Sequence, residues 1–213
     1  MLSVVIPTLN AAASLRATMA SVIEADEVVV ADGGSLDGTQ ALAETLGARV
    51  VRAQRGRGAQ LAAGVVAARG DWLLLLHADT RLAPGWRRSR VAPDFAGYFR
   101  FALDSDDPRA RRLERLVAWR CRMLALPYGD QGLLIHRDLL RQVGGILPLP
   151  LMEDVDLVRR LGRRRLVGLD VAAVTSAAKW QRQGWYRRSA RNLACLALYF
   201  AGVPPRLIAQ LYG

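Results

Sequence analysis

The sequence predicts an α/β fold of three layers, in which helices cover both faces of a mostly parallel, mixed sheet. Four strand–helix repeats occupy the first 80 residues, a pattern typical of parallel sheets. A longer alternating strand follows in the second half. The chain has 213 residues, 52% of them hydrophobic, which is enough for one sizeable core. No internal repeat or low-complexity linker interrupts it, so we expect one domain spanning residues 1–213.

Short apolar runs mark the strands of the first half. They are rich in valine or leucine and end at a proline, an acid or another turn residue. Apolar residues at helical spacing lie between them, with Asp37 as a candidate cap and Gly47 and Gly70 as stops. We expect strands at residues 2–6, 27–31, 49–52 and 72–76, and helices at residues 12–25, 38–46 and 59–69.

The second half changes character. Apolar and other residues alternate over 95–103, which predicts a strand, and we expect it to run antiparallel to the rest. A helix is expected over 108–126, with Leu113, Leu116, Val117 and Leu124 facing inward. Further strands are expected at residues 132–136 and 166–174, and further helices at residues 137–143, 154–161, 186–201 and 205–212.

The charge balance favours anionic partners. The net charge is +11, and Lys179 is the only lysine, so arginine carries almost all of it. Arginine pairs bidentately with phosphate, although a compositional habit would explain the total equally well. Cys121 and Cys195 lie far apart without CxxC spacing, which argues against a disulfide or a cysteine-bound metal.

The segments at the two ends bear on location. The chain enters a strand at once and has no run of 18 apolar residues, so we expect no signal peptide, no membrane span and a cytoplasmic location. The arginine-rich helices and the apolar segment 193–212 could rest on an anionic membrane, at its inner face. Aromatic residues rarely interleave with these arginines and no nucleic-acid motif is visible, so nucleic acid is not an expected partner.

Asp79 is the candidate metal ligand. It follows the leucine run 73–76, and an acid at the end of a buried strand lies at the sheet edge where open α/β folds bind ligands. Mg²⁺ and Mn²⁺ accept one carboxylate when phosphates and water supply the other ligands. His77 is either a second ligand or a hydrogen-bonded neighbour.

Glu153 and Asp154 form the second acidic cluster, about 75 residues after the first. A carboxylate there could take the proton of an acceptor hydroxyl as a general base. Two acids at the start of a helix are also favourable for the helix itself, and by spacing alone that simpler interpretation is preferred.

Polar residues also close the first two strands and a later loop. Thr8 and Asn10 could contact a nucleobase, or Asn10 could cap a helix. Asp32 with Gly33 could meet a base or ribose, or form a tight turn. Arg57 lies in a basic loop before a helix and could bind phosphate, or be solvated.

Two further segments suit a sugar acceptor or a diphosphate. The segment 128–132 is polar, aromatic and flexible, and the alternative is a plain turn. Lys179 and Trp180 follow the last strand and could cover a diphosphate or stack on a sugar, or simply pack at the surface.

Taken in order, these motifs resemble the family 2 glycosyltransferases of the GT-A fold, the Rossmann-like fold of nucleotide-diphospho-sugar transferases. They resemble more closely a small bacterial glycosyltransferase-2-like subgroup associated with radical-SAM/selenoprotein-type gene neighbourhoods. The resemblance covers nearly the whole chain, and only the ordered set is specific. The matching stretches are residues 3–10, 31–39, 56–60, 76–80, 128–131 and 151–155.

The resemblance implies a metal-dependent, inverting transfer of a sugar from a nucleotide-diphosphate sugar, UDP- or GDP-linked, to a hydroxyl acceptor, for which a lipid-linked alcohol is one candidate. Residues 1–80 would form the nucleotide-binding half, 81–185 the acceptor half, and 186–213 the apolar C-terminal helices. Asp154 would be the general base with Glu153 beside it, and Asp79 would hold Mn²⁺ or Mg²⁺. The implied nucleotide-sugar contacts are Pro7, Thr8, Asn10, Asp32, Gly33, Arg57 and Ala78, and the implied acceptor contacts are Tyr128, Gly129, Asp130, Gln131 and Trp180.

Two positions depart from the family pattern. Ala11 stands where the family often has a glutamate, and His77 stands where the wider family has an aspartate. The first removes a nucleotide-side contact, and the second bears on metal affinity. A non-catalytic module of the same fold that binds nucleic acid or acidic lipid through its arginines is the alternative function.

Overall fold

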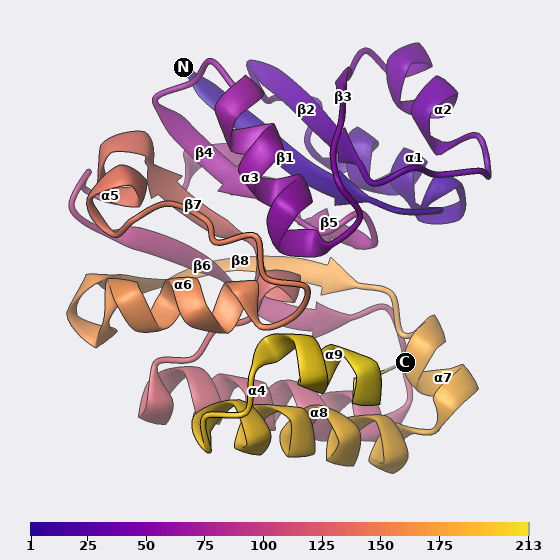
Figure 1. Cartoon of the computed structure of the whole chain (residues 1–213), viewed down its shortest axis with the longest axis vertical. Helices are drawn as coiled ribbons and strands as arrows, with labels where there is room; N and C mark the ends of the chain where they lie inside the picture. Colours follow the sequence, from indigo (N-terminus) through magenta and orange to yellow (C-terminus); the bar gives the residue numbers. More distant parts are fainter. Residues whose placement is uncertain (213) are drawn as a thin grey trace.

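A computed structural model describes residues 1–212, and its centre is one eight-stranded mixed sheet (Figure 1). The strand order is β3-β2-β1-β4-β7-β6-β8-β5, so both halves of the chain contribute to it. The strands are β1 (Leu2–Thr8), β2 (Glu27–Asp32), β3 (Arg49–Arg52), β4 (Trp72–Leu75), β5 (Thr80–Leu82), β6 (Ala96–Leu103), β7 (Leu133–His136) and β8 (Leu166–Thr175).

The α/β expectation is confirmed, but one strand direction is wrong. β1 to β4 are parallel, as expected. β7 runs antiparallel to both β4 and β6, so β6 points the same way as β1 to β4. The reversed strands are therefore β7 and the short β5. Alternation along β6 reports which face of the strand is buried and carries no information about direction.

The helices cover both faces of the sheet (Figure 1). Most lie within a few residues of their expected positions, although the first ends at Ser21 rather than at residue 25. The short helix α7 and the three-residue strand β5 were not expected. The helices are α1 (Ala12–Ser21), α2 (Thr39–Thr45), α3 (Arg57–Ala67), α4 (Pro108–Leu124), α5 (Arg137–Gln142), α6 (Glu153–Leu161), α7 (Ala178–Gln183), α8 (Trp185–Phe200) and α9 (Pro205–Tyr212).

The two largest apolar clusters lie on opposite faces of the sheet. Residues of α1 and α2 pack against one face, and residues of α3, α5 and α6 pack against the other. A Cβ at Gly64 of α3 would lie 2.4 Å from Val5 Cγ1, so this helix approaches β1 as closely as glycine allows. Close contact fixes α3, whose first residue is Arg57, at the carboxyl end of the parallel strands.

The expected inner face of α4 needs correction. Leu116 and Leu124 are 63% and 52% exposed, while Ala110, Val117 and Cys121 are buried. Val117 is buried and Leu113 packs against the same cluster, as expected, whereas Leu116 and Leu124 were wrongly placed because Ala110 and Cys121 complete the buried stripe. Among residues 1–212, no helix is both long and apolar enough to cross a membrane.

Candidate active site

The carboxyl ends of β1 and β2 meet at a buried Thr–Asp pair. Thr8 Oγ1 donates to Asp32 Oδ2 at 2.9 Å, and both side chains are fully buried. Asp32 also accepts from the Ser35 backbone and hydroxyl and from Gln40 Nε2. Burial raises the pKa of Asp32, but the hydrogen bonds from Ser35, Thr8 and Gln40 outweigh it and lower the pKa. Asp32 is therefore an ionised anchor for the 33–35 turn.

Asn10 holds the same turn from the other side. Its φ is +51°, its side-chain oxygen accepts from Leu36 N at 2.9 Å, and its own N–H donates to Ser35 Oγ at 2.8 Å. Gly33 lies against Gln60, since a Cβ there would be 2.9 Å from Gln60 Nε2. Pro7 is buried within β1. These residues lie at the sheet edge where we expected a nucleotide to bind. The hydrogen bonds among them fix the shape of the 33–35 turn.

Asp79 and Asp154 line one cleft. Asp79 leaves the carboxyl end of β4 and Asp154 lies in the first turn of α6. The cleft encloses about 790 Å³, a volume that includes space open to solvent. Its lining residues are Arg57, His77, Asp79, Tyr128, Asp130, Leu151, Met152, Asp154, Val155, Thr175, Lys179, Trp180, Arg188, Asn192, Cys195 and Leu196.

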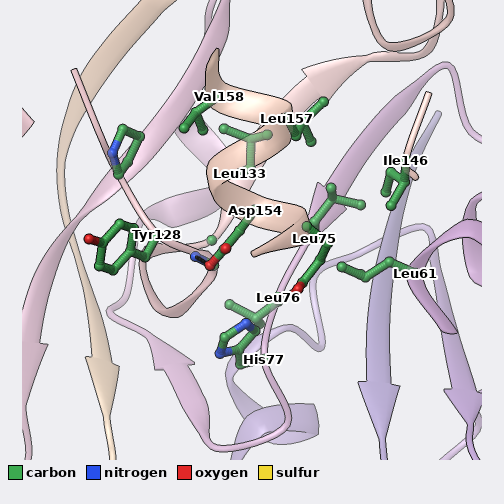
Figure 2. Close-up of a pocket in the computed structure, with 14 residues that line it drawn as sticks. Leu61, Leu75, Leu76, His77, Tyr128, Leu133, Ile146, Asp154, Leu157 and Val158 are labelled. Carbon is green, nitrogen blue, oxygen red and sulfur yellow. Dashed lines mark hydrogen bonds between the residues drawn. The ribbon is translucent and has the colours of Figure 1, made fainter. Parts of the chain in front are cut away.

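The Asp154 carboxylate is held by backbone donors. Oδ2 accepts from Gly129 N and Oδ1 from Val155 N, both at 2.8 Å. Each oxygen keeps one acceptor position, so the group can still receive a proton. Met152, just before α6, has φ +66°, a conformation uncommon for a residue with a side chain. Figure 2 shows Asp154 between Tyr128 and His77, at the end of an apolar pocket.

Arg57 joins both acidic segments. Its Nε lies 3.2 Å from Glu153 Oε1, and its Nη1 lies 3.2 Å from His77 Nε2. Burial and the Arg57 charge lower the pKa of His77 to about 4, so the ring is neutral and Nε2 accepts from the guanidinium. In this arrangement His77 Nε2 is turned to Arg57, which favours the neighbour role of His77 over the ligand role.

Glu153 is a buried carboxyl group behind the cleft. Its side chain is only 1% exposed, and within residues 1–212 its Oε2 has no hydrogen-bond partner. Burial and the nearby Asp154 raise its pKa to about 7, while Arg57 opposes the rise. Glu153 faces Arg57 and is absent from the cleft lining, so it can position Arg57.

Asp79 pairs with a lysine from the other half of the chain. Lys179 Nζ lies 2.8 Å from Asp79 Oδ2. Burial raises the pKa of Asp79, but Lys179 and Arg57 outweigh it and lower the pKa.

The backbone carbonyl of Ala78, a predicted nucleotide-sugar contact, accepts from Thr18 Oγ1.

The donors around Asp79 fit a cation held mainly by its substrate. Among residues 1–212, no cluster of three or more metal-ligating side chains exists. Asp79 does lie in the cleft, and Asp130 contributes a buried oxygen, Oδ1, that lacks a hydrogen-bond partner in the described chain. Burial, with Asp154 and Asp79 nearby, raises the pKa of Asp130 to about 6. A divalent cation would relieve this crowding of carboxylates.

The predicted acceptor residues divide into two groups. Tyr128, Asp130 and Trp180 line the cleft, and Gly129 lines the adjoining apolar pocket and donates its N–H to Asp154. Gln131 is 2% exposed, and its amide bonds to Phe99 O, Tyr128 N and Cys121 Sγ, so it supports the loop from below. Trp180 is buried in a core with Phe101 and also lines the cleft.

The sequence analysis missed several cleft residues. Arg188, Asn192 and Leu196 come from α8 at intervals of four, and Thr175 ends β8. The spacing of Arg188 and Asn192 was a usable signal, because polar residues four apart share a helix face. Nothing local, however, showed that this face of α8 closes the cleft.

Structural comparison identifies the class of fold. A crystal structure of glucosyl-3-phosphoglycerate synthase from Mycobacterium tuberculosis, in complex with Mn²⁺, UDP and glucosyl-3-phosphoglycerate, matches 96% of this chain and 81% of its own with a TM-score of 0.65 and 22% identity. S. aureus TarS matches 83% of this chain and 37% of its own with a TM-score of 0.63 and 16% identity. The protein has the GT-A fold of glycosyltransferases.

The sequence comparison matches the first half of the chain to one family. Residues 3–104 match the model of glycosyl transferase family 2. This segment includes β1 to β4 and Asp79. The match covers slightly less than half of the chain, so it shows a similarity of the first half to glycosyl transferase family 2.

Proposed function

We propose that the protein is an inverting glycosyltransferase that uses a nucleotide-diphosphate sugar. The observation that carries this proposal is the meeting of Asp79 and Asp154, which are 75 residues apart, in one cleft. The similar synthase binds Mn²⁺ and UDP-glucose, which supports a UDP-sugar as the first donor to test. We also propose that the protein belongs to glycosyl transferase family 2 and, within it, to the subgroup associated with radical-SAM/selenoprotein-type gene neighbourhoods.

The proposed reaction is a single displacement. The acceptor oxygen attacks the anomeric carbon of the donor, the bond from that carbon to the diphosphate breaks, and the configuration inverts. Asp154 takes the acceptor proton as the new bond forms, and the nucleoside diphosphate leaves. Arg57 and Lys179 face the same space, and their charges stabilise the diphosphate as negative charge develops.

Asp79 would hold the Mn²⁺ or Mg²⁺ implied by the family. Such a cation supplies charge neutralisation on the diphosphate oxygens. Tyr128, Asp130 and Trp180 would border the acceptor, and Gly129 orients Asp154. The turn of Thr8, Asn10, Asp32 and Gly33, next to Pro7, would receive the nucleoside through its backbone and outer side chains.

A non-catalytic anion-binding module is less favoured. Such a module would have little use for buried carboxylates beside its arginines, yet Asp79, Asp130 and Asp154 line this cleft and Glu153 lies behind it. Contact with an anionic membrane concerns a different face of the molecule, the outer side of α4 and α8.

Asp154→Asn tests the proposal. UDP-, GDP- and TDP-sugars are first screened by thermal shift with Mn²⁺, because a bound ligand raises the apparent melting temperature. With the donor so found, Asp154→Asn should lower turnover by about 10²- to 10⁴-fold and leave the thermal shift in place. Asp156→Asn, on the same helix and ion-paired to Arg160, is the matched control. Unchanged turnover in Asp154→Asn would refute the assignment of the base.

A further inference from the structure

The net charge of the protein is concentrated in two segments. Residues 108–124, which form α4, and residues 176–212, which include α7 to α9, hold 12 arginine and lysine residues and one glutamate. Their balance is +11, which equals the net charge of the whole chain, so all other residues together are neutral. The single glutamate, Glu114, is paired with Arg111 at 2.6 Å.

The same helices expose large apolar side chains. On α4, Leu116, Trp119 and Met123 are each more than half exposed, and their spacing of three and four places them on one face. On α8, Tyr186, Leu193 and Phe200 recur every seven residues and likewise share a face. The exposed large hydrophobic residues of these helices are Leu116, Trp119, Met123, Leu124, Tyr186, Leu193, Phe200, Leu207 and Leu211.

The two helices lie side by side in the layer farthest from β3 (Figure 1). At their first turns, the Arg109 guanidinium stands 5.7 Å from the Trp185 ring. Near their last turns, Leu196 and Tyr199 of α8 pack against the cluster that contains Leu126, just after α4. The two exposed stripes therefore belong to one outer layer, which we name the α4/α8 face.

We propose that the α4/α8 face docks on an anionic membrane surface. A large exposed apolar patch marks an interaction site, and leucine, methionine and tryptophan gain free energy by entering the headgroup region. The surrounding arginines complement anionic lipid. Nucleic acid would satisfy the arginines and leave the aliphatic side chains in water. A second copy of the chain would bring two faces of like charge together.

Docking would place the cleft beside the lipid headgroups. The inner side of α8 lines the cleft through Arg188, Asn192 and Leu196, while its outer side carries the exposed stripe. The two sides are separated by less than one helix diameter, about 10 Å. The docking itself does not depend on the proposed transferase activity.

Vesicle sedimentation of the full chain tests this inference. Phosphatidylcholine vesicles with about one third phosphatidylglycerol should retain the protein, and added salt should weaken the retention. Replacing three exposed residues, Leu116→Gln, Trp119→Gln and Leu193→Gln, should weaken binding about tenfold or more. Reversing two exposed charges, Arg112→Glu and Arg115→Glu, should weaken it by a similar factor.

The matched control changes exposed apolar residues elsewhere. Ile23→Gln, Leu36→Gln and Val66→Gln alter side chains at least 83% exposed in the first half of the chain and should leave binding unchanged. Circular dichroism and melting temperatures establish that every variant is folded. Vesicle binding that survives the apolar triple variant but not the charge reversal would mark a general polyanion site and overturn the inference. So would absence of binding, or a concentration-dependent dimer that the triple variant abolishes.

Discussion

Burial and charge act against each other at Glu153. The side chain is 1% exposed, so its ionised form loses hydration, and Asp154 adds a like charge. Arg57 offsets part of this cost through an ion pair of 3.2 Å. Because the guanidinium also contacts His77, Arg57 connects Glu153 to His77. Removing the carboxylate should therefore affect both stability and the orientation of Arg57.

The pH dependence of stability tests the state of Glu153. Its pKa of about 7 in the folded protein exceeds the ordinary 4.5, so the folded state holds more protons between these values. Stability should therefore fall as pH rises through this window. The Gln side chain of Glu153→Gln cannot ionise. The stability of this variant relative to the parent should therefore be about 1–3 kcal/mol greater at pH 8 than at pH 5. Urea denaturation at both pH values measures this, with the exposed Glu44→Gln as the control. An equal difference at both pH values would contradict the account.

Gly129 tests how closely the two acidic segments are packed. A Cβ there would lie 2.4 Å from His77 Nε2 and 3.3 Å from Asp154 Oδ2. Gly129→Ala should displace His77 and Asp154, so turnover should fall by about 10²-fold, as a misplaced catalytic group does. Gly168→Ala is the control, because its Cβ would meet Tyr98 at an ordinary 3.4 Å. Turnover of Gly129→Ala equal to that of the control would show that the base does not depend on this contact.

At the scale of elements, α3 connects the parallel sheet to the cleft. The sequence predicts Arg57 in a loop before a helix that begins at residue 59, but α3 begins at Arg57 itself. The difference places the guanidinium on a fixed helix end. The next residue, Gly58, allows the 147–149 segment to cross over the start of the helix, since its N–H donates to Leu149 O.

Gly58→Ala should push the 147–149 segment away from the start of α3. The added Cβ would lie 2.4 Å from Leu147 O and 2.6 Å from Leu149 N and O, and backbone atoms cannot rotate away. The segment that leads into α6 must shift, so we expect a loss of about 1–3 kcal/mol of stability together with loss of turnover. Chemical denaturation and donor turnover measure the two effects. Val66→Ala, 83% exposed on the same helix, is the control. A Gly58→Ala protein as stable as this control would contradict the packing described.

The elements differ in how well local sequence predicts them. β1 to β4 and their helices carry strong apolar periodicity with clear stops, and the structure places them close to the expected positions. β5 and α7 are too short to produce a period, and they were missed. The direction of β6 was wrong because direction depends on which neighbour a strand pairs with, and its neighbours are β7 and β8.

At the scale of the whole molecule, the cleft results from a pairing that no local pattern encodes. β7 pairs antiparallel with β4 and carries the preceding 128–131 loop to the carboxyl end of β4. Gly129 of that loop then holds Asp154, and β8 brings Lys179 to Asp79. Motif order led to Asp79 and Asp154, whereas Arg188 and Asn192 became visible only once α8 was in place.

The charge of the molecule is also divided at this scale. The cleft gathers carboxylates with a few cations, while the excess of +11 lies on α4 and the segment after β8. Both regions include α8: one side of this helix lines the cleft, and another side lies on the outer face. A total that first suggests a general affinity for anions therefore separates into a cleft lined by carboxylates and an outer face rich in arginine.

Anomalous diffraction from crystals grown with Mn²⁺ and a bound UDP-sugar tests the central claim most directly. The account predicts a manganese peak at bonding distance from an Asp79 oxygen and the diphosphate, about 2.0–2.3 Å. It also predicts that the anomeric carbon of the sugar faces the Asp154 side of the cleft. A nucleotide sugar bound on another surface, or a manganese ion held away from Asp79, would contradict it.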